Sequence, residues 1–79
     1  MIRVLFFGPV AELVGAREKE VAFHAGMRVQ DVHAQLQMSY PAAFEIACFA
    51  AVNGEHLRDM SLPLADNSEV VFMARFSGG

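Results

Sequence analysis

The sequence opens with Met1-Ile-Arg-Val-Leu-Phe-Phe7, an apolar run interrupted by a single arginine. The composition of this run predicts a β-strand, in which successive side chains point to opposite faces. One face carries Ile2, Val4 and Phe6, and the other carries Arg3, Leu5 and Phe7. Both faces are largely apolar, and Gly8-Pro9 ends the strand. We therefore expect an interior strand with apolar contacts on both sides of its sheet.

Outward from this strand, the pattern predicts a short helix over residues 9–14 and a second strand over 17–23, with Glu18 and Glu20 toward water. Apolar residues spaced three and four apart then predict an amphipathic helix from Val29 to Met38. Shorter signals indicate a turn or two of helix over 42–47, strands over 49–53 and 55–57, and a last strand over 69–76. This order predicts an α+β domain with a mixed sheet of four to five strands packed on one main helix.

A second apolar sheet face is unexpected when one helix covers the first. Leu5 and Phe7 of the first strand, and Val71 and Met73 of the last, all point away from the predicted core. If these two strands are neighbours, the four side chains form one patch, which is typical of a partner-binding surface. The alternative is that they are ordinary scattered surface hydrophobes.

Composition narrows the class of protein. The chain has 79 residues, is 54% hydrophobic and has a net charge of −3 without a basic run, which argues against binding to nucleic acid. A single cysteine excludes an internal disulfide and fits a reducing compartment. The apolar stretch near Met1 is too short for a signal peptide or membrane span, so we expect a cytoplasmic protein without a membrane partner.

Catalytic and metal-binding motifs are missing: no phosphate-binding glycine loop, paired cysteines or zinc-binding histidine pair occurs, and no metal site is expected. The ending Ser77-Gly78-Gly79 stands out instead, because glycine can lie extended in a channel too narrow for other residues. The terminal carboxylate is ionised at neutral pH and is a poor electrophile. Making it reactive therefore requires a separate ATP-using enzyme. The alternative is a passive flexible tail.

Several segments, matching in order along the whole chain, resemble a known family. They are Met1–Phe7, Pro9–Gly15, Tyr40-Pro41, Ala51–Asn53, Leu64–Asp66, Glu69-Val70 and Ser77-Gly78-Gly79. Together they are similar to the small subunits of molybdopterin synthase, the MoaD branch of the MoaD/ThiS sulfur carriers. The resemblance implies a ubiquitin-like β-grasp fold, with a domain over residues 1–76 and a flexible tail over 77–79.

The resemblance also implies a function. Gly79, preceded by Gly78, would be adenylated by an activating enzyme similar to ubiquitin E1 that uses ATP and magnesium, and would then become a thiocarboxylate. The tail would enter the large synthase subunit, in a heterotetramer, and give its sulfur to cyclic pyranopterin monophosphate. This chain would bind no cofactor itself and would have no self-contained active site. The implied partner-binding residues are Leu5, Phe7, Leu57, Val71, Met73, Arg75, Phe76 and Ser77.

Departures from the family pattern leave alternatives open. Ala74-Arg75 stands where the family often has two prolines, and Asp66-Asn67-Ser68 where it often has Asp-Gly-Asp. The same chemistry could serve thiamine, cysteine or transfer-RNA thiolation, although thiamine carriers typically lack much of the segment 40–48. A ubiquitin-like modifier joined to lysines through Gly79 and a passive interaction module are the remaining alternatives.

Overall fold

The computed structural model describes residues 1–74, and at Cys48 it describes the backbone alone. Five strands and three helices make up this part of the chain, which confirms the α+β class. In chain order they are β1 (Ile2–Phe6), α1 (Gly8–Val14), β2 (Glu18–Val21), α2 (Val29–Ser39), α3 (Pro41–Ile46), β3 (Ala47–Val52), β4 (Glu55–His56) and β5 (Glu69–Ala74).

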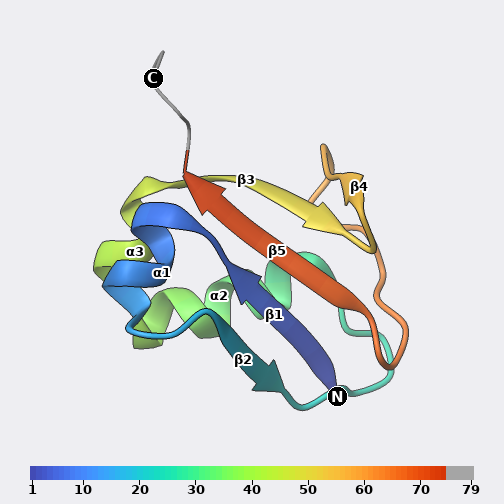
Figure 1. The fold of residues 1–79 in the computed structure, drawn as a ribbon. Coiled ribbons are helices and arrows are strands. Elements are labelled where there is room, and N and C mark those ends of the chain that lie inside the picture. Colours follow the sequence, from blue (N-terminus) through green and yellow to red (C-terminus); the bar gives the residue numbers. More distant parts are fainter. Residues whose placement is uncertain (75–79) are drawn as a thin grey trace.

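The five strands form one mixed sheet in the order β2-β1-β5-β3-β4. The first and last strands, β1 and β5, are parallel neighbours at its centre, with Leu5 opposite Val71 (Figure 1). All other neighbouring strands are antiparallel. The predicted pairing of the first and last strands is therefore confirmed, and it places the apolar residues of both strands side by side.

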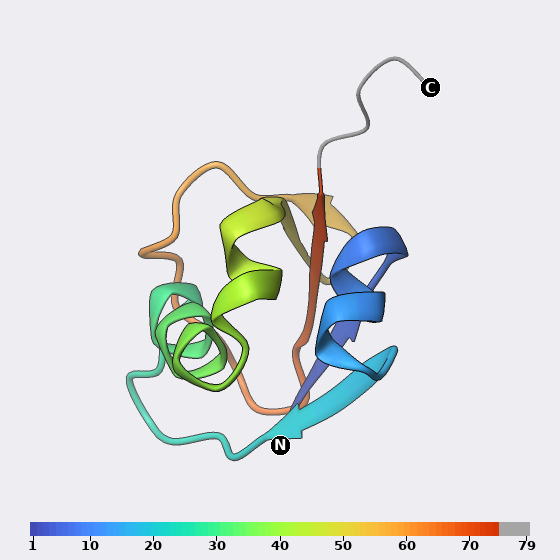
Figure 2. The ribbon, with the colours of Figure 1, turned by 90° about the vertical axis from the view of Figure 1, so that its left-hand side faces the viewer.

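Helices α2 and α3 lie on one side of the sheet (Figure 2). We call the opposite side, which faces the viewer in Figure 1, the outer face. α2 is the predicted main helix, and Pro41 both follows it and opens α3. α1 packs against α3 and β5, and it ends at Gly15 with a left-handed φ of 82°. Within residues 1–74 no helix has the length and apolar character needed to cross a bilayer.

A single core lies between the sheet and the helices. The first face of β1 is fully buried in it, as predicted, and Val70 and Phe72 of β5 lie beside it. Phe44 of α3 meets Phe72 edge to face, with ring centroids 5.1 Å apart. The buried apolar residues of this core are Ile2, Val4, Phe6, Val10, Val14, Val21, Met27, Val29, Val32, Leu36, Ala43, Phe44, Ala50, Val52, Leu64, Val70, Phe72 and Ala74.

Most element ends differ from the sequence prediction by one or two residues, and the differences at β3 and β2 change the sheet most. β3 begins at Ala47 rather than Phe49, because Ala47 pairs with Ala74 across a register shift in the ladder. β2 ends at Val21, and Phe23 beyond it is half-buried against the core without belonging to the strand. Both turns marked by asparagine are confirmed, since Asn53 and Asn67 have φ of 49° and 67°.

Candidate functional site

The outer face of the sheet divides into a charged end and an apolar end. At the charged end, where β1 and β5 begin, Arg3 lies between Glu20 and Glu69 and forms an ion pair with Glu69. At the apolar end, β1 and β5 lead to Phe7 and Met73. We define the apolar patch as the outer-face residues Leu5, Phe7, Phe49, Val71 and Met73.

Phe7 and Met73 are the accessible centre of the apolar patch. Phe7 extends β1 by one residue, and its backbone N–H donates to the carbonyl of Phe72, 3.4 Å away. Its side chain is 49% exposed. Met73, paired with Phe49 of β3, is half-buried, as are Leu5 and Phe49. An exposed ring among half-buried apolar neighbours on a rigid sheet is suited to docking another protein.

Val71 lies on the outer face but contributes little surface. It stands in the central strand between Leu5 and Ala51, and only 8% of it is exposed. The sequence correctly places it opposite the core. Its low exposure means that it adds little accessible area to the patch.

Leu57 does not lie in the apolar patch. Its backbone N–H donates to the carbonyl of Ala50 at 2.8 Å, and its side chain packs against the core. It also lines a hollow of about 330 Å³ beside β4, together with Val52, Glu55, His56, Arg58, Asp59 and Leu62. The outer-face position on β4 belongs to His56, whose ring centroid lies 5.5 Å from that of Phe49.

Phe49 and His56 are therefore the outer-face residues that sequence reasoning missed. Phe49 could have been found by alternation along its strand. Ala50 faces the core, so its neighbours Phe49 and Ala51 face the other way. His56 could not, because β4 has only two residues and shows no alternation of its own.

The remaining predicted site residues, Arg75, Phe76, Ser77, Gly78 and Gly79, lie outside the described residues, as does the predicted boundary between domain and tail. What the structure describes is their point of origin. β5 ends at Ala74, one residue after Met73, at the end of the sheet where the apolar patch lies (Figure 1). Gly79 stands five residues after Ala74, so it can lie at most about 18 Å from the end of β5.

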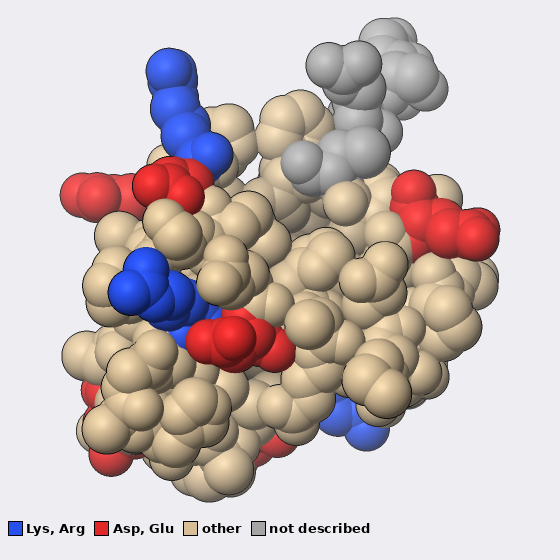
Figure 3. All heavy atoms as spheres, turned by 180° about the vertical axis from the view of Figure 1, so that it is seen from behind, with Lys and Arg blue, Asp and Glu red and all other residues tan. Residues whose placement is uncertain are grey.

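Titratable groups of the described part do not gather into an active site. Among residues 1–74 no group of three potential metal ligands occurs. His33 lies on the helix side, where its ring meets Phe44 at 5.0 Å and Phe72 at 5.9 Å, and burial lowers its pKa. Figure 3 shows scattered charges of both signs on that side, without a cluster of Lys or Arg.

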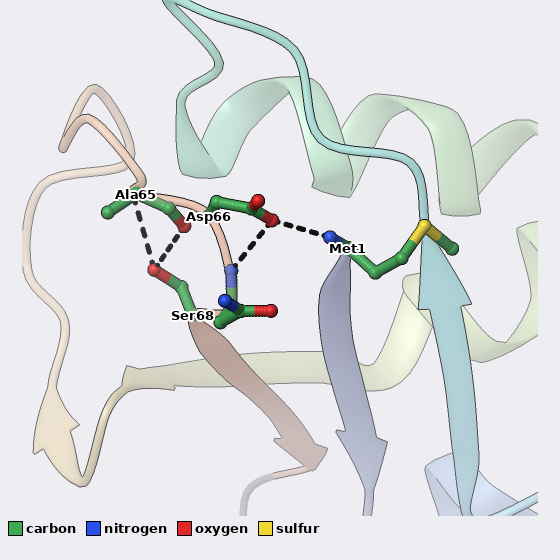
Figure 4. A network of polar contacts seen from close by, with 5 residues as sticks. Met1, Ala65, Asp66 and Ser68 are labelled. Atoms are coloured by element: carbon green, nitrogen blue, oxygen red, sulfur yellow. Dashed lines mark hydrogen bonds and ion pairs between the residues drawn. The ribbon is translucent and has the colours of Figure 1, made fainter.

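Polar contacts fix the charged end of the sheet. The amino group of Met1 lies 2.5 Å from the carboxylate of Asp66, which also accepts the backbone N–H of Asn67 (Figure 4). The hydrogen bond to that amino group holds the pKa of Asp66 below its ordinary value. Ser68, the buried polar residue of this turn, bonds to both the N–H and the carbonyl of Ala65. The start of β5 is therefore anchored beside β1, which keeps the two halves of the apolar patch in register.

A five-stranded sheet with its first and last strands parallel at the centre, and with α2 and α3 on one face opposite an apolar face, defines a ubiquitin-like β-grasp domain. Comparisons with known proteins agree. The ThiS family model matches residues 4–79. The chain is also 31% identical to the molybdopterin synthase sulfur carrier subunit of Chlamydomonas reinhardtii, over 99% of this chain and 98% of that protein.

Two solved structures share the fold. SAMP1 from Haloferax volcanii superposes with a TM-score of 0.83 at 21% identity, covering 99% of this chain and 98% of that one. A chain of the complex of subunits 1 and 2 of the molybdopterin-converting factor from Helicobacter pylori gives 0.74 at 20% identity, covering 99% and 97%. The chain belongs to the ThiS family.

Proposed function

We propose that this chain is the sulfur-carrying small subunit of molybdopterin synthase, acting in molybdenum cofactor biosynthesis. The observation that carries the proposal is the apolar patch at the end of β5, from which the chain continues to Gly78 and Gly79. Docking through the patch would bring the tail to the mouth of a partner's active site. The name of the Chlamydomonas relative supports this choice of pathway.

The chemistry proposed for Gly79 follows from the properties of a carboxylate. An ionised carboxylate resists nucleophiles, and adenylation by an E1-like enzyme with ATP and magnesium would give it a good leaving group. A sulfur donor would then displace AMP and leave a thiocarboxylate. Sulfur transfer to cyclic pyranopterin monophosphate would take place within the large subunit.

Two proteins would bind the apolar patch, one after the other. One is the large subunit of molybdopterin synthase, in a heterotetramer, and the other is the activating enzyme. The Helicobacter pylori structure is a complex of a subunit 1 with a subunit 2, which supports the first of these. We propose the cytoplasm as the location, since ATP and thiol sulfur donors are available there.

Intact-mass spectrometry tests the proposed chemistry. After incubation with the activating enzyme, ATP and a sulfur source, the chain should gain the mass difference between one sulfur and one oxygen atom. A variant lacking Gly79 should gain nothing. An unchanged wild-type mass, or an equal gain in the variant, would refute the proposal.

A ubiquitin-like modifier is the second candidate, and the likeness to SAMP1, a small archaeal modifier protein, favours it. A modifier would end in an amide bond between Gly79 and lysines of other proteins. Stable high-mass conjugates that persist in denaturing gels of cell extract would support this function. Their absence, together with thiocarboxylate formation, would support the sulfur carrier.

A further inference from the structure

Strand β2 separates its charges by sign. The sequence Arg17-Glu18-Lys19-Glu20 alternates basic and acidic residues with the period of a strand. Glu18 pairs with Leu5 and Glu20 with Arg3, so both carboxylates stand on the outer face. Lys19 pairs with Val4, whose side chain is in the core, and its ammonium group lies 5.9 Å from the Tyr40 ring on the helix side. We call Glu18 and Glu20 the acidic margin.

Among residues 1–74, the acidic margin is the unpaired charge of the outer face. Arg3 forms an ion pair with Glu69, whereas neither Glu18 nor Glu20 forms one with another residue of 1–74. Both are exposed, and Glu18 directly adjoins Leu5 of the apolar patch. Figure 1 shows β2 as the edge strand beside β1, so the two carboxylates border the patch along one side only.

Protection of the sheet edge explains why β2 is charged but not why its charges are sorted. An edge strand resists pairing with another chain when it carries charges of either sign. Placing both acids on the outer face and Lys19 on the other adds a negative potential beside the patch. Apolar burial is non-directional, so a charged border on one side supplies the orientation that an apolar patch lacks.

We propose that the acidic margin docks against Lys or Arg side chains of the protein that covers the apolar patch, and that it steers and orients this docking. The proposal rests on the proposed function and takes the large subunit of molybdopterin synthase as the occupant. The patch would then set how long the complex lasts, and the margin would set how fast it forms. Charges at the rim of an interface act mainly on the association rate and on its salt dependence.

Stopped-flow association with the purified large subunit of the same organism tests this inference. The variant Glu18→Gln/Glu20→Gln should associate about three- to ten-fold more slowly than wild type at low salt, with a weaker dependence on sodium chloride. The matched control is Glu45→Gln/Glu55→Gln. It removes the same charge from exposed positions, one on α3 and one opposite the buried Val52, and should stay within about two-fold of wild type.

The outcomes separate the inference from the proposed function. Equal association rates for the margin variant and the control, or a faster rate for the margin variant, would refute the docking role of the acidic margin. The proposed function would remain intact. No association of the wild type would overturn both, and it would be seen before any variant is compared. Mass spectrometry would then distinguish the two remaining cases. A thiocarboxylate would indicate a sulfur carrier with another partner, and its absence would indicate a chain without this chemistry.

Discussion

Phe7 is the residue on which docking should depend most. Half of its surface is exposed although it is aromatic and lies on a sheet, so changing it removes little core packing. We expect Phe7→Glu to weaken binding to the large subunit at least ten-fold. Burial of such a side chain contributes about 1.5–3 kcal/mol, and a buried unpaired carboxylate adds a further cost. Isothermal titration calorimetry measures the change.

Met38→Glu is the matched control for this prediction. Met38 is 86% exposed on α2, on the opposite side of the sheet, and the substitution introduces the same charge. It should bind the large subunit as wild type does. Normal binding by Phe7→Glu, or equal losses in both variants, would show that the partner does not cover the apolar patch.

His33 should make the stability of the fold depend on pH. Its ring packs against both Phe44 and Phe72, and burial holds its pKa below the ordinary value of 6.5. The unfolded chain therefore takes up a proton at a higher pH than the folded chain does. Stability is complete above about pH 6.5 and falls as the pH drops from there toward the folded pKa. The unfolding temperature should decrease over this interval.

His33→Leu isolates this contribution, because leucine keeps an apolar contact and cannot be protonated. Thermal melts at pH 7.5 and 5.5 should show a smaller difference for the variant than for the wild type. His24→Leu, a change at an exposed histidine, should leave the wild-type difference in place. An equal pH dependence in His33→Leu would assign the effect to other groups.

At the scale of elements, the start of α2 shows what a sequence can and cannot predict. The spacing of Val29, Val32 and Leu36 predicts the helix, and all three are buried. No capping side chain is evident at Arg28. In the structure, the backbone N–H groups of Val29 and Gln30 donate to the carbonyls of Leu62 and Met60. A loop thirty residues away satisfies the helix end, and backbone carbonyls leave no signature in sequence.

Asp31 also stabilises the start of α2. Its carboxylate accepts the backbone N–H of Arg28 at 2.8 Å and lies in the first turn, where a negative charge is favourable. Asp31→Ala should lower the free energy of unfolding by about 1 kcal/mol. Asp31→Asn, which keeps an acceptor and loses the charge, should cost less. Urea denaturation compares them, and equal stability of wild type and Asp31→Ala would contradict the role.

At the scale of the whole molecule, the sequence predicts the arrangement well where many residues agree. The structure confirms the strands predicted at both ends of residues 1–74, the main helix and the two asparagine turns. The patch is predicted less completely, because membership depends on neighbours across strands. Val71 faces away from the core but is only 8% exposed, and Leu57 packs against the core beside β4. Exposure of a side chain is a property of the assembled sheet, and alternation along one strand does not determine it.

Fold and chemistry should be separable in this molecule, because within the described residues 1–74 the core already forms one cluster that joins both central strands to the helices. Deleting Ser77, Gly78 and Gly79 should therefore leave the unfolding temperature within about 2 °C of wild type while abolishing thiocarboxylate formation. Phe7→Glu should instead weaken binding to the large subunit, since it keeps Gly79 and loses the docking surface. Differential scanning calorimetry and intact-mass spectrometry on both variants complete the comparison. A truncated chain that unfolds much earlier than wild type would mean that the tail stabilises the domain, and a carrier whose tail packs against its own sheet would have to release it before each transfer.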